Sequence, residues 1–270
     1  MINTSLMKNK KGLVMGVANE RSIAWAIAKA LSDSGADVAL TYQGEALKKR
    51  VGPLANQINS SLILECNVEN ENDILKTFKE MKKKWKTIDF VVHAIAFSNR
   101  EELKGKYLNT SKDNFKKTMD ISCYSFTAIA REAEKIMSKG GSLLTLSYFG
   151  SEKFMPHYNV MGIAKSALEA SIKYLAKDLG KKNIRVNALS PGPIKTLAAS
   201  AIGDFNYILK WNENNSPLKR NITVDDISGS AIYLLSDLSS GVTGEVHHVD
   251  SGYNIIGMKD TDSPDIFEEK

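Results

Sequence analysis

Residues 12–35 read GLVMGVANERSIAWAIAKALSDSG and pass from a strand pattern into a helical pattern. Residues 12–17 are apolar and strand-forming, and residues 22–35 repeat apolar side chains at the helical period. This stripe consists of Ile23, Ala26, Ile27, Ala30 and Leu31. Free backbone N–H groups and the positive end of the helix dipole meet at such a turn, so that it suits a phosphate group. The stretch predicts the first βα unit of a nucleotide-binding sheet.

The same alternation continues along the chain. Further strand patterns cover residues 36–42, 61–68, 88–97, 141–149, 184–192 and 245–253. Further helical patterns cover residues 45–58, 71–85, 114–137, 158–180 and 225–238, and the first of these is interrupted near Gly52 and Pro53. Repeated βαβ units place helices on both faces of a parallel sheet. We therefore predict an α/β fold, a Rossmann-type doubly wound parallel sheet of about seven strands.

The composition is that of an ordinary globular protein. The 270 residues are 43% hydrophobic and 25% charged, enough for one sizeable core. We expect a single domain over residues 1–270, because no internal linker is rich in Pro, Gly or Ser. The stretch 193–224 breaks the alternation and should lie over the carboxyl ends of the strands, where open sheets bind ligands. Residues 259–270 carry little to bury, so we expect a loose tail there.

Charge and cysteine usage exclude several classes of protein. The net charge of +5 comes from scattered lysines without arginine clusters, so that no nucleic-acid partner is predicted. No apolar run reaches the roughly 18–20 residues of a membrane span, and the opening MINTSLMKNKKG lacks the apolar core of a secretory signal. Cys66 and Cys123 predict reduced thiols in a cytoplasmic protein. The four histidines lack metal-ligand spacing, and we expect no metal.

The first turn is a weak dinucleotide motif by itself. The usual fingerprint is G-x-G-x-x-G, and here only Gly16 is present. Ser22 can cap the helix and bond a phosphate oxygen. An ordinary strand-to-helix turn remains the alternative. At the end of the second strand, Gln43 can bond ribose hydroxyls but offers no positive charge to a 2′-phosphate, which favours NADH. The nearby lysines and arginine of residues 48–50 leave NADPH as the less favoured alternative.

A candidate catalytic group lies where the fifth strand gives way to a helix. The segment 147–165, SYFGSEKFMPHYNVMGIAK, holds Tyr148, Tyr158 and Lys165. If Tyr158 begins the helix, Lys165 lies about two turns further on the same face. A lysine near a phenol lowers the pKa of the tyrosine. The pair would then donate a proton or a hydrogen bond to an oxyanion beside a nicotinamide. The alternative for a bare Tyr-x6-Lys pair is a tyrosine and a lysine on the protein surface without a catalytic role.

Fold order and the Tyr/Lys pair resemble the short-chain dehydrogenase/reductase superfamily. Most members carry Tyr-x-x-x-Lys, a three-glycine turn and Asn-Asn-Ala-Gly after the fourth strand. This chain instead has Tyr-x6-Lys, GVANERSIA and HAIAF. Together these departures are similar to the NADH-dependent enoyl-acyl-carrier-protein reductases of bacterial type II fatty-acid synthesis. The segments SYFGSEKFMPHYNVMGIAKSALEAS, RVNALSPGPIKTLAAS and TGEVHHVDSGY agree, and the resemblance extends from about Gly12 to Met258.

The resemblance implies an activity and a set of binding residues. The implied reaction is reduction of a trans-2-enoyl thioester with NADH, in which Tyr158 faces the thioester carbonyl. The implied cofactor residues are Gly16, Ser22 and Ile23 at the pyrophosphate, Gln43 at the adenosine ribose, Asn67 and Val68 at the adenine, Ala94 and Ile95 beside the cofactor, Lys165 at the nicotinamide ribose, and Ile194 and Thr196 at the carboxamide and phosphates. The implied substrate residues are Ala96, Phe97, Tyr148, Met161, Ala198, Ile202 and Phe205.

Further implications concern partners and moving parts. The resemblance implies an acyl carrier protein as the partner that presents the substrate, a homotetramer built on the two long helices 114–137 and 158–180, and a substrate-binding lid at about 195–215. The role of Tyr148 stays open between shaping the acyl pocket and donating a proton. Two other functions are retained as alternatives: a carbonyl (3-oxoacyl-type) reductase of the same superfamily, and a non-catalytic dinucleotide-binding regulator.

Overall fold

The computed structural model describes residues 5–196, 199 and 203–264. Within these residues one seven-stranded parallel sheet has the order β3-β2-β1-β4-β5-β6-β7. The strands are β1 Lys11–Met15, β2 Asp37–Tyr42, β3 Ile63–Glu65, β4 Phe90–His93, β5 Gly141–Leu146, β6 Ile184–Pro191 and β7 Val246–Val249. The sheet runs outward from β1 in both directions, so that the strand order reverses between β1 and β4. This is the predicted doubly wound topology, and its reversal point is where such sheets bind ligands.

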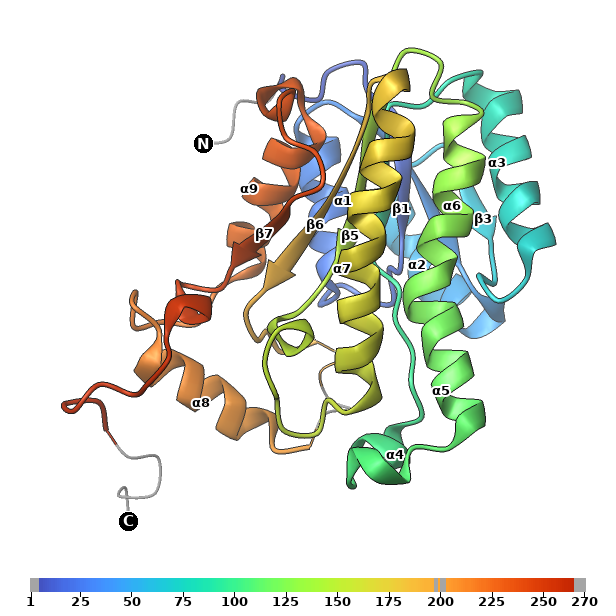
Figure 1. Ribbon diagram of the computed structural model, residues 1–270. Helices are drawn as coiled ribbons and strands as arrows, with labels where there is room; N and C mark the ends of the chain where they lie inside the picture. The colour runs from blue at the N-terminus through green and yellow to red at the C-terminus, as the bar shows by residue number, and fades with distance from the viewer. Residues whose placement is uncertain (1–4, 197–198, 200–202, 265–270) are drawn as a thin grey trace.

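Helices cover both faces of the sheet (Figure 1). They are α1 Ile23–Asp33, α2 Gly44–Gln57, α3 Glu71–Trp85, α4 Arg100–Leu103, α5 Lys112–Met119, α6 Ser125–Glu134, α7 Val160–Leu179, α8 Phe205–Asn215 and α9 Val224–Leu235. Helices α3, α6 and α7 lie in front of the sheet in Figure 1, and α1, α2 and α9 lie behind it. Helices α4 and α8 lie below the sheet in the same view, beyond the carboxyl ends of the strands.

Alternate side chains of the strands pack into two hydrophobic cores, one on each face of the sheet. In β1, Val14 packs into the core shared with α1, α2 and α9, and its neighbours Leu13 and Met15 pack into the core shared with α3, α6 and α7. All three are fully buried. Successive side chains of a strand point to opposite faces, and a parallel sheet covered on both faces therefore reads as a continuous apolar run. This explains the unbroken pattern at residues 12–17.

Several predicted boundaries differ from the structure. The predicted strand 88–97 ends at His93, and the predicted strands 141–149 and 245–253 end at Leu146 and Val249. Residues 94–97, 147 and 148 line cavities at the end of the sheet, whereas residues 250–253 form a largely polar turn. The predicted interruption near Gly52 and Pro53 is wrong, since α2 continues through Pro53.

The predicted helix 114–137 is divided in the structure. Helices α5 and α6 are joined by a π-helical segment, Asp120–Tyr124. The predicted helix 158–180 starts two residues later than expected, because Asn159 has a φ of 40° that no right-handed helix contains. The expected tail begins at residue 259. Ser263 within it is buried and accepts a hydrogen bond from the Lys219 ammonium, and residues 265–270 lie outside the described part.

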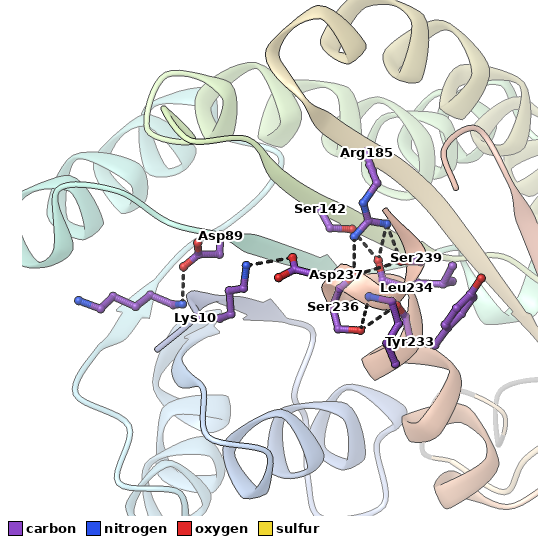
Figure 2. Close-up of polar contacts among 11 residues, drawn as sticks. Lys10, Asp89, Ser142, Arg185, Tyr233, Leu234, Ser236, Asp237 and Ser239 are labelled. Carbon is purple, nitrogen blue, oxygen red and sulfur yellow. Dashed lines mark hydrogen bonds and ion pairs between the residues drawn. The ribbon is translucent and has the colours of Figure 1, made fainter. Parts of the chain in front are cut away.

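The amino end of the sheet is held by a polar cluster (Figure 2). The guanidinium of Arg185, in β6, donates to the carbonyls of Leu234 and Ser236 at the end of α9 and to the Ser239 hydroxyl, at 2.8, 3.0 and 2.7 Å. Ser142 of β5 donates to the same Leu234 carbonyl at 2.9 Å. A cation at a helix carboxyl terminus satisfies the free carbonyls and the dipole. This cluster fixes α9 at the end of the sheet that is opposite to α4 and α8.

No helix in the described part of the chain is both long and apolar enough to cross a membrane.

Candidate active site

Two adjoining cavities open where successive strands end. The first, of about 310 Å³, is lined by residues that follow β1, β2, β3 and β4. The second, of about 860 Å³, is lined by residues that follow β4, β5 and β6 together with parts of α1, α5, α7 and α8. Ala96, Phe97 and Lys117 belong to both linings. The two cavities therefore meet beside the end of β4, at the reversal point of the sheet.

The structure distributes the predicted residues between these cavities. The first cavity is lined by Gly16, Gln43, Asn67, Val68, Ala94, Ile95, Ala96 and Phe97. The second is lined by Ile23, Ala96, Phe97, Tyr148, Tyr158, Met161, Ile194, Thr196 and Phe205. Ser22 and Lys165 line neither cavity. Ala198 and Ile202, the other two predicted substrate residues, lie outside the described residues.

The turn after β1 needs a glycine. Gly16 has a φ of +98°, and a Cβ atom there would lie 2.0 Å from the carbonyl oxygen of Ala94. The ends of β1 and β4 thus approach more closely than any side chain at this position allows. Beyond the turn, no hydrogen bond of the Ile23 or Ala24 N–H is found in the described part of the chain. These two donors at the N-terminus of α1 suit the pyrophosphate of a dinucleotide.

Ser22 occupies the N-cap position of α1 but does not cap the helix through its side chain. Its hydroxyl donates to the carbonyl of Asn19 at 2.5 Å and accepts from the N–H of Ala18 at 3.3 Å. The prediction that Ser22 caps the helix is therefore wrong. The hydroxyl instead closes the turn 18–22, and this shape leaves the helix N–H groups open to a ligand.

Tyr148 and Tyr158 form the chemical centre of the second cavity. Their rings meet edge to face with centroids 4.9 Å apart. Tyr158 is buried and Tyr148 is partly buried, and neither hydroxyl has a hydrogen-bond partner among the described residues. Neither hydroxyl oxygen is among the fully buried polar atoms that lack a partner, so both oxygens are accessible to a ligand in the cavity. Two such groups at one cavity are therefore positioned to bond a ligand.

Burial raises the pKa of both phenols. For Tyr158, the neighbouring Tyr148 and Glu169 raise the pKa further. For Tyr148, the second cause is Tyr253. The prediction that Lys165 lowers the pKa of Tyr158 is wrong, because desolvation of the phenolate decides the direction. Both groups therefore keep their protons at neutral pH and are able to donate a hydrogen bond.

Lys165 lies behind this centre. It is 5% exposed, and its ammonium donates to the carbonyl oxygen of Leu146, the last residue of β5, at 2.6 Å. Burial lowers the pKa of Lys165 to about 8, while Cys123 and Glu169 act in the opposite direction. An ammonium has three donors, and Leu146 is its single acceptor within the described residues. The remaining donors suit hydroxyl groups of a ribose.

Sequence reasoning missed two further residues at this site, Asn159 and Glu169. The side-chain amide of Asn159 donates to the carbonyls of Glu102, Leu103 and Gly105 at 3.2, 3.1 and 2.9 Å, which ties the Tyr158 loop to α4. Glu169 accepts hydrogen bonds from Ser147 and Ser151. A possible signal was the position of Glu169 one helical turn after Lys165.

The described residues contain no group of three or more His, Cys, Asp or Glu side chains that could hold a metal ion. His93 is buried between Thr145 and Ser125, with ring nitrogens 3.0 and 2.9 Å from their hydroxyls. Burial lowers the pKa of His93 to about 3. His248 instead pairs with Glu152 at 2.7 Å. Both histidines have protein partners.

A Rossmann-type sheet, a close glycine turn after its first strand, and two tyrosines and a lysine beyond the carboxyl end of β5 are typical of dinucleotide-dependent oxidoreductases of the short-chain dehydrogenase/reductase type. The family model described as enoyl-(acyl carrier protein) reductase matches residues 16–254. Enoyl-acyl-carrier-protein reductase (NADH) 1 of Rhizobium meliloti (strain 1021) is 64% identical over 263 residues, which cover 97% of each chain. The chain belongs to the enoyl-acyl-carrier-protein reductase family.

Solved structures agree with this assignment. The enoyl-acyl-carrier-protein reductase of Anaplasma phagocytophilum in complex with NAD is 56% identical, with a TM-score of 0.93 over 97% of this chain and 98% of that chain. The Bacillus cereus enoyl-acyl-carrier-protein reductase with NADP⁺ and an indole naphthyridinone is 50% identical, with a TM-score of 0.92 over 94% and 100%. The predicted fold and family are confirmed.

Proposed function

We propose that this protein reduces the trans-2 double bond of enoyl thioesters carried by acyl carrier protein, with NADH as the reductant, in the last step of the fatty-acid elongation cycle. The observation that carries the proposal is the pair of phenol hydroxyls at the wall of an apolar cavity, neither of which has a partner among the described residues. That cavity adjoins the glycine turn where a dinucleotide binds. Membership of the enoyl reductase family favours this reaction over carbonyl reduction and over a non-catalytic regulator.

The residues present fit the dinucleotide. The N–H groups of Ile23 and Ala24 would hold the pyrophosphate, and Gln43 in the first cavity would bond the adenosine ribose. Asn67 and Val68 would flank the adenine. The Lys165 ammonium has donors left for the second ribose. When bound, NADH supplies the hydride that reaches the β-carbon of the enoyl thioester.

Tyr158 supplies the main stabilisation of the reaction. Reduction at the β-carbon places negative charge on the thioester oxygen, as an enolate, and protonation of the α-carbon then completes the saturated chain. Tyr158 stays protonated because burial raises its pKa. Its hydroxyl therefore donates a hydrogen bond to this oxygen at no cost in reorganisation. The protein otherwise orients the alkene and excludes water from it.

The second cavity suits an acyl chain. Met161, Phe205 and Ala199 give it an apolar wall, while Tyr148 lies beside Tyr158 at its inner end. An apolar cavity with a few convergent polar groups is the usual form of such a site. We propose that Tyr148 shapes this cavity and holds the ring of Tyr158, with Tyr158 as the hydrogen-bond donor.

The partner of the reaction is acyl carrier protein, which presents the substrate. We also propose a homotetramer in the cytoplasm. Support for the assembly comes from large side chains exposed on the two long helical segments, and these are Phe115, Tyr124, Ile163 and Tyr174. Burial of such groups between copies is a familiar source of association energy. Sedimentation of the purified protein would test the tetramer.

The activity is tested by the absorbance of NADH at 340 nm with two thioesters. We expect oxidation of NADH with crotonyl thioester and little or none with acetoacetyl thioester. Faster oxidation with acetoacetyl thioester would identify a carbonyl reductase. Binding of NADH without oxidation by either thioester would identify a regulator and overturn the proposal.

A further inference from the structure

The segment between β5 and the loop that carries Tyr158 lies unusually close to α7. A Cβ atom on Gly162 of α7 would come within 2.6 Å of the Gly150 carbonyl, and one on Gly150 would come within 2.4 Å of the Tyr158 ring. Ser166 of α7 also donates to the Ser151 carbonyl at 2.5 Å. The position of residues 147–151 therefore sets the positions of both phenols, since Tyr148 lies within this segment and Tyr158 packs against it.

A single carboxylate oxygen ties this segment to α7. The hydroxyls of Ser147 and Ser151 both donate to Oε1 of Glu169, and the bond from Ser151 is 2.6 Å long. Tyr148 lies between these two serines. Ser147 itself is buried and lines the second cavity. The hydrogen bond between Ser147 and Glu169 is therefore made by a buried residue of the cavity wall.

The same carboxylate acts on Lys165, which lies one helical turn earlier. Its charge favours the protonated ammonium, in opposition to burial. The other titratable groups around Lys165 are Cys123 of the π-helical segment, His93 of β4 and Tyr158. Burial favours the neutral form of each of these three groups. Cys123 and then Glu169 favour the charged form of Lys165, and Glu169 is the carboxylate of the two.

We propose that Glu169 is a positioning residue for the reductase reaction: its carboxylate fixes the segment 147–151, and with it both phenols, against α7 at one helical turn from Lys165. The inference rests on the proposed function, because Lys165 and the two tyrosines act there on cofactor and substrate. It predicts two separable effects. Loss of the charge changes the pH dependence of NADH binding, and loss of a tether changes the rate at every pH.

Three variants separate these effects. Glu169→Gln keeps an oxygen that accepts from both serines but removes the charge. Ser151→Ala removes one tether and keeps the charge. Asp178→Asn is the matched control, because it removes an exposed carboxylate from the same helix. For each we would measure the Kd of NADH by fluorescence from pH 6 to pH 9.5, and kcat with crotonyl thioester over the same range.

In the wild type we expect NADH binding to weaken as the pH rises through about 8, where Lys165 loses its proton. In Glu169→Gln this transition should move down by about one pH unit, because an attractive charge is lost. At pH 8 the Kd should then rise roughly fivefold, with little change at pH 6. Ser151→Ala should lower kcat severalfold without moving the transition, and Asp178→Asn should match the wild type.

Superimposable Kd profiles of the wild type and Glu169→Gln would overturn the electrostatic role, and an unchanged kcat in Ser151→Ala would overturn the tether. A wild type that binds NADH but reduces no enoyl thioester would overturn the proposed function, while the Kd profiles still decide the role of Glu169. If Glu169→Gln does not fold, as judged by near-UV circular dichroism, Glu169→Asp replaces it. That variant keeps the charge, so a shifted transition in it would contradict the inference.

Discussion

The ring of Tyr148 meets the ring of Tyr158 edge to face, at 4.9 Å between centroids and 65° between planes. Such a pair has a preferred geometry and fixes both rings. Because the hydroxyl of Tyr158 is then held without a protein partner, its removal should affect the transition state more than ground-state binding. We expect Tyr158→Phe to lower kcat by roughly 10²–10³-fold, as for loss of one oxyanion donor, with the Kd of NADH nearly unchanged.

Tyr148→Phe is the matched comparison, since it removes the same atom from the neighbouring ring. We expect a fall in kcat of less than about tenfold, because the ring that shapes the cavity remains. Stopped-flow absorbance at 340 nm with crotonyl thioester measures both variants. A larger fall in kcat for Tyr148→Phe than for Tyr158→Phe would show that Tyr148 is the hydrogen-bond donor and that Tyr158 shapes the cavity.

Sequence patterns predicted the sheet because they report burial on two faces. The run at residues 12–17 and the stripe beginning at Ile23 are both consequences of packing that appear directly in residue type. The ends of strands were less accurate. Residues 95–97 are as apolar as β4, but they line cavities instead of pairing with a neighbouring strand. Hydrophobicity does not distinguish a buried strand from a cavity wall.

The chemistry of the site was only partly readable. The residue types and their order along the chain were enough to propose Tyr148, Tyr158 and Lys165 as the candidate catalytic residues. The pKa of Tyr158 was not predictable, because it depends on how completely the fold buries the ring. The positive φ of Asn159 and the contact of Glu169 with Ser147 were also invisible. They depend on tertiary contacts between segments that no local pattern specifies.

The closeness of Gly16 to Ala94 gives a prediction about stability. A Cβ on Gly16 meets the Ala94 carbonyl at 2.0 Å, whereas Gly44 also has a positive φ but has nothing within 4 Å. Gly44→Ala should cost about 1–2 kcal/mol for the left-handed backbone alone. Gly16→Ala should cost at least about 2 kcal/mol more because the strands must separate. Urea unfolding measures both, and equal losses would show that the close approach is easily relieved.

Buried His93 makes stability depend on pH in a defined window. Burial lowers its pKa in the folded state to about 3, against about 6.5 in the unfolded chain. The unfolded state therefore binds more protons between these values, so that stability is complete above pH 6.5 and falls as the pH decreases toward 3. From pH 6.5 to pH 5 the loss due to His93 should be about 2 kcal/mol.

The test is urea unfolding of the wild type and His93→Gln at both pH values. Glutamine keeps an amide near the Thr145 and Ser125 hydroxyls and does not titrate. The variant should be less stable at pH 6.5 but should lose about 2 kcal/mol less on acidification. Equal losses in both proteins would show that His93 is not protonated on unfolding in this range.

An exposed ion pair at the end of β2 gives a prediction about cofactor choice. Glu45 pairs with Lys48 at 3.0 Å, and Lys48 lies 5.9 Å from the centre of the Tyr42 ring, beside Gln43 of the first cavity. The hydrogen bond that Lys48 donates to the Glu45 carboxylate raises the pKa of Lys48, and the pair holds this ammonium away from other anions. Glu45→Gln should free this charge for a 2′-phosphate and raise kcat/KM for NADPH roughly two- to fivefold, with little change for NADH.

The control is Glu132→Gln, which breaks the partly exposed Glu132–Lys135 pair of the same i,i+3 spacing at the end of α6. It should leave the ratio of NADPH to NADH activity unchanged. Lys48→Ala added to Glu45→Gln should return the ratio to the wild-type value, because no other effect of Glu45 is invoked. An increase in NADPH activity that persists without Lys48 would assign cofactor choice to the negative charge of Glu45 itself and would contradict the role given to the pair.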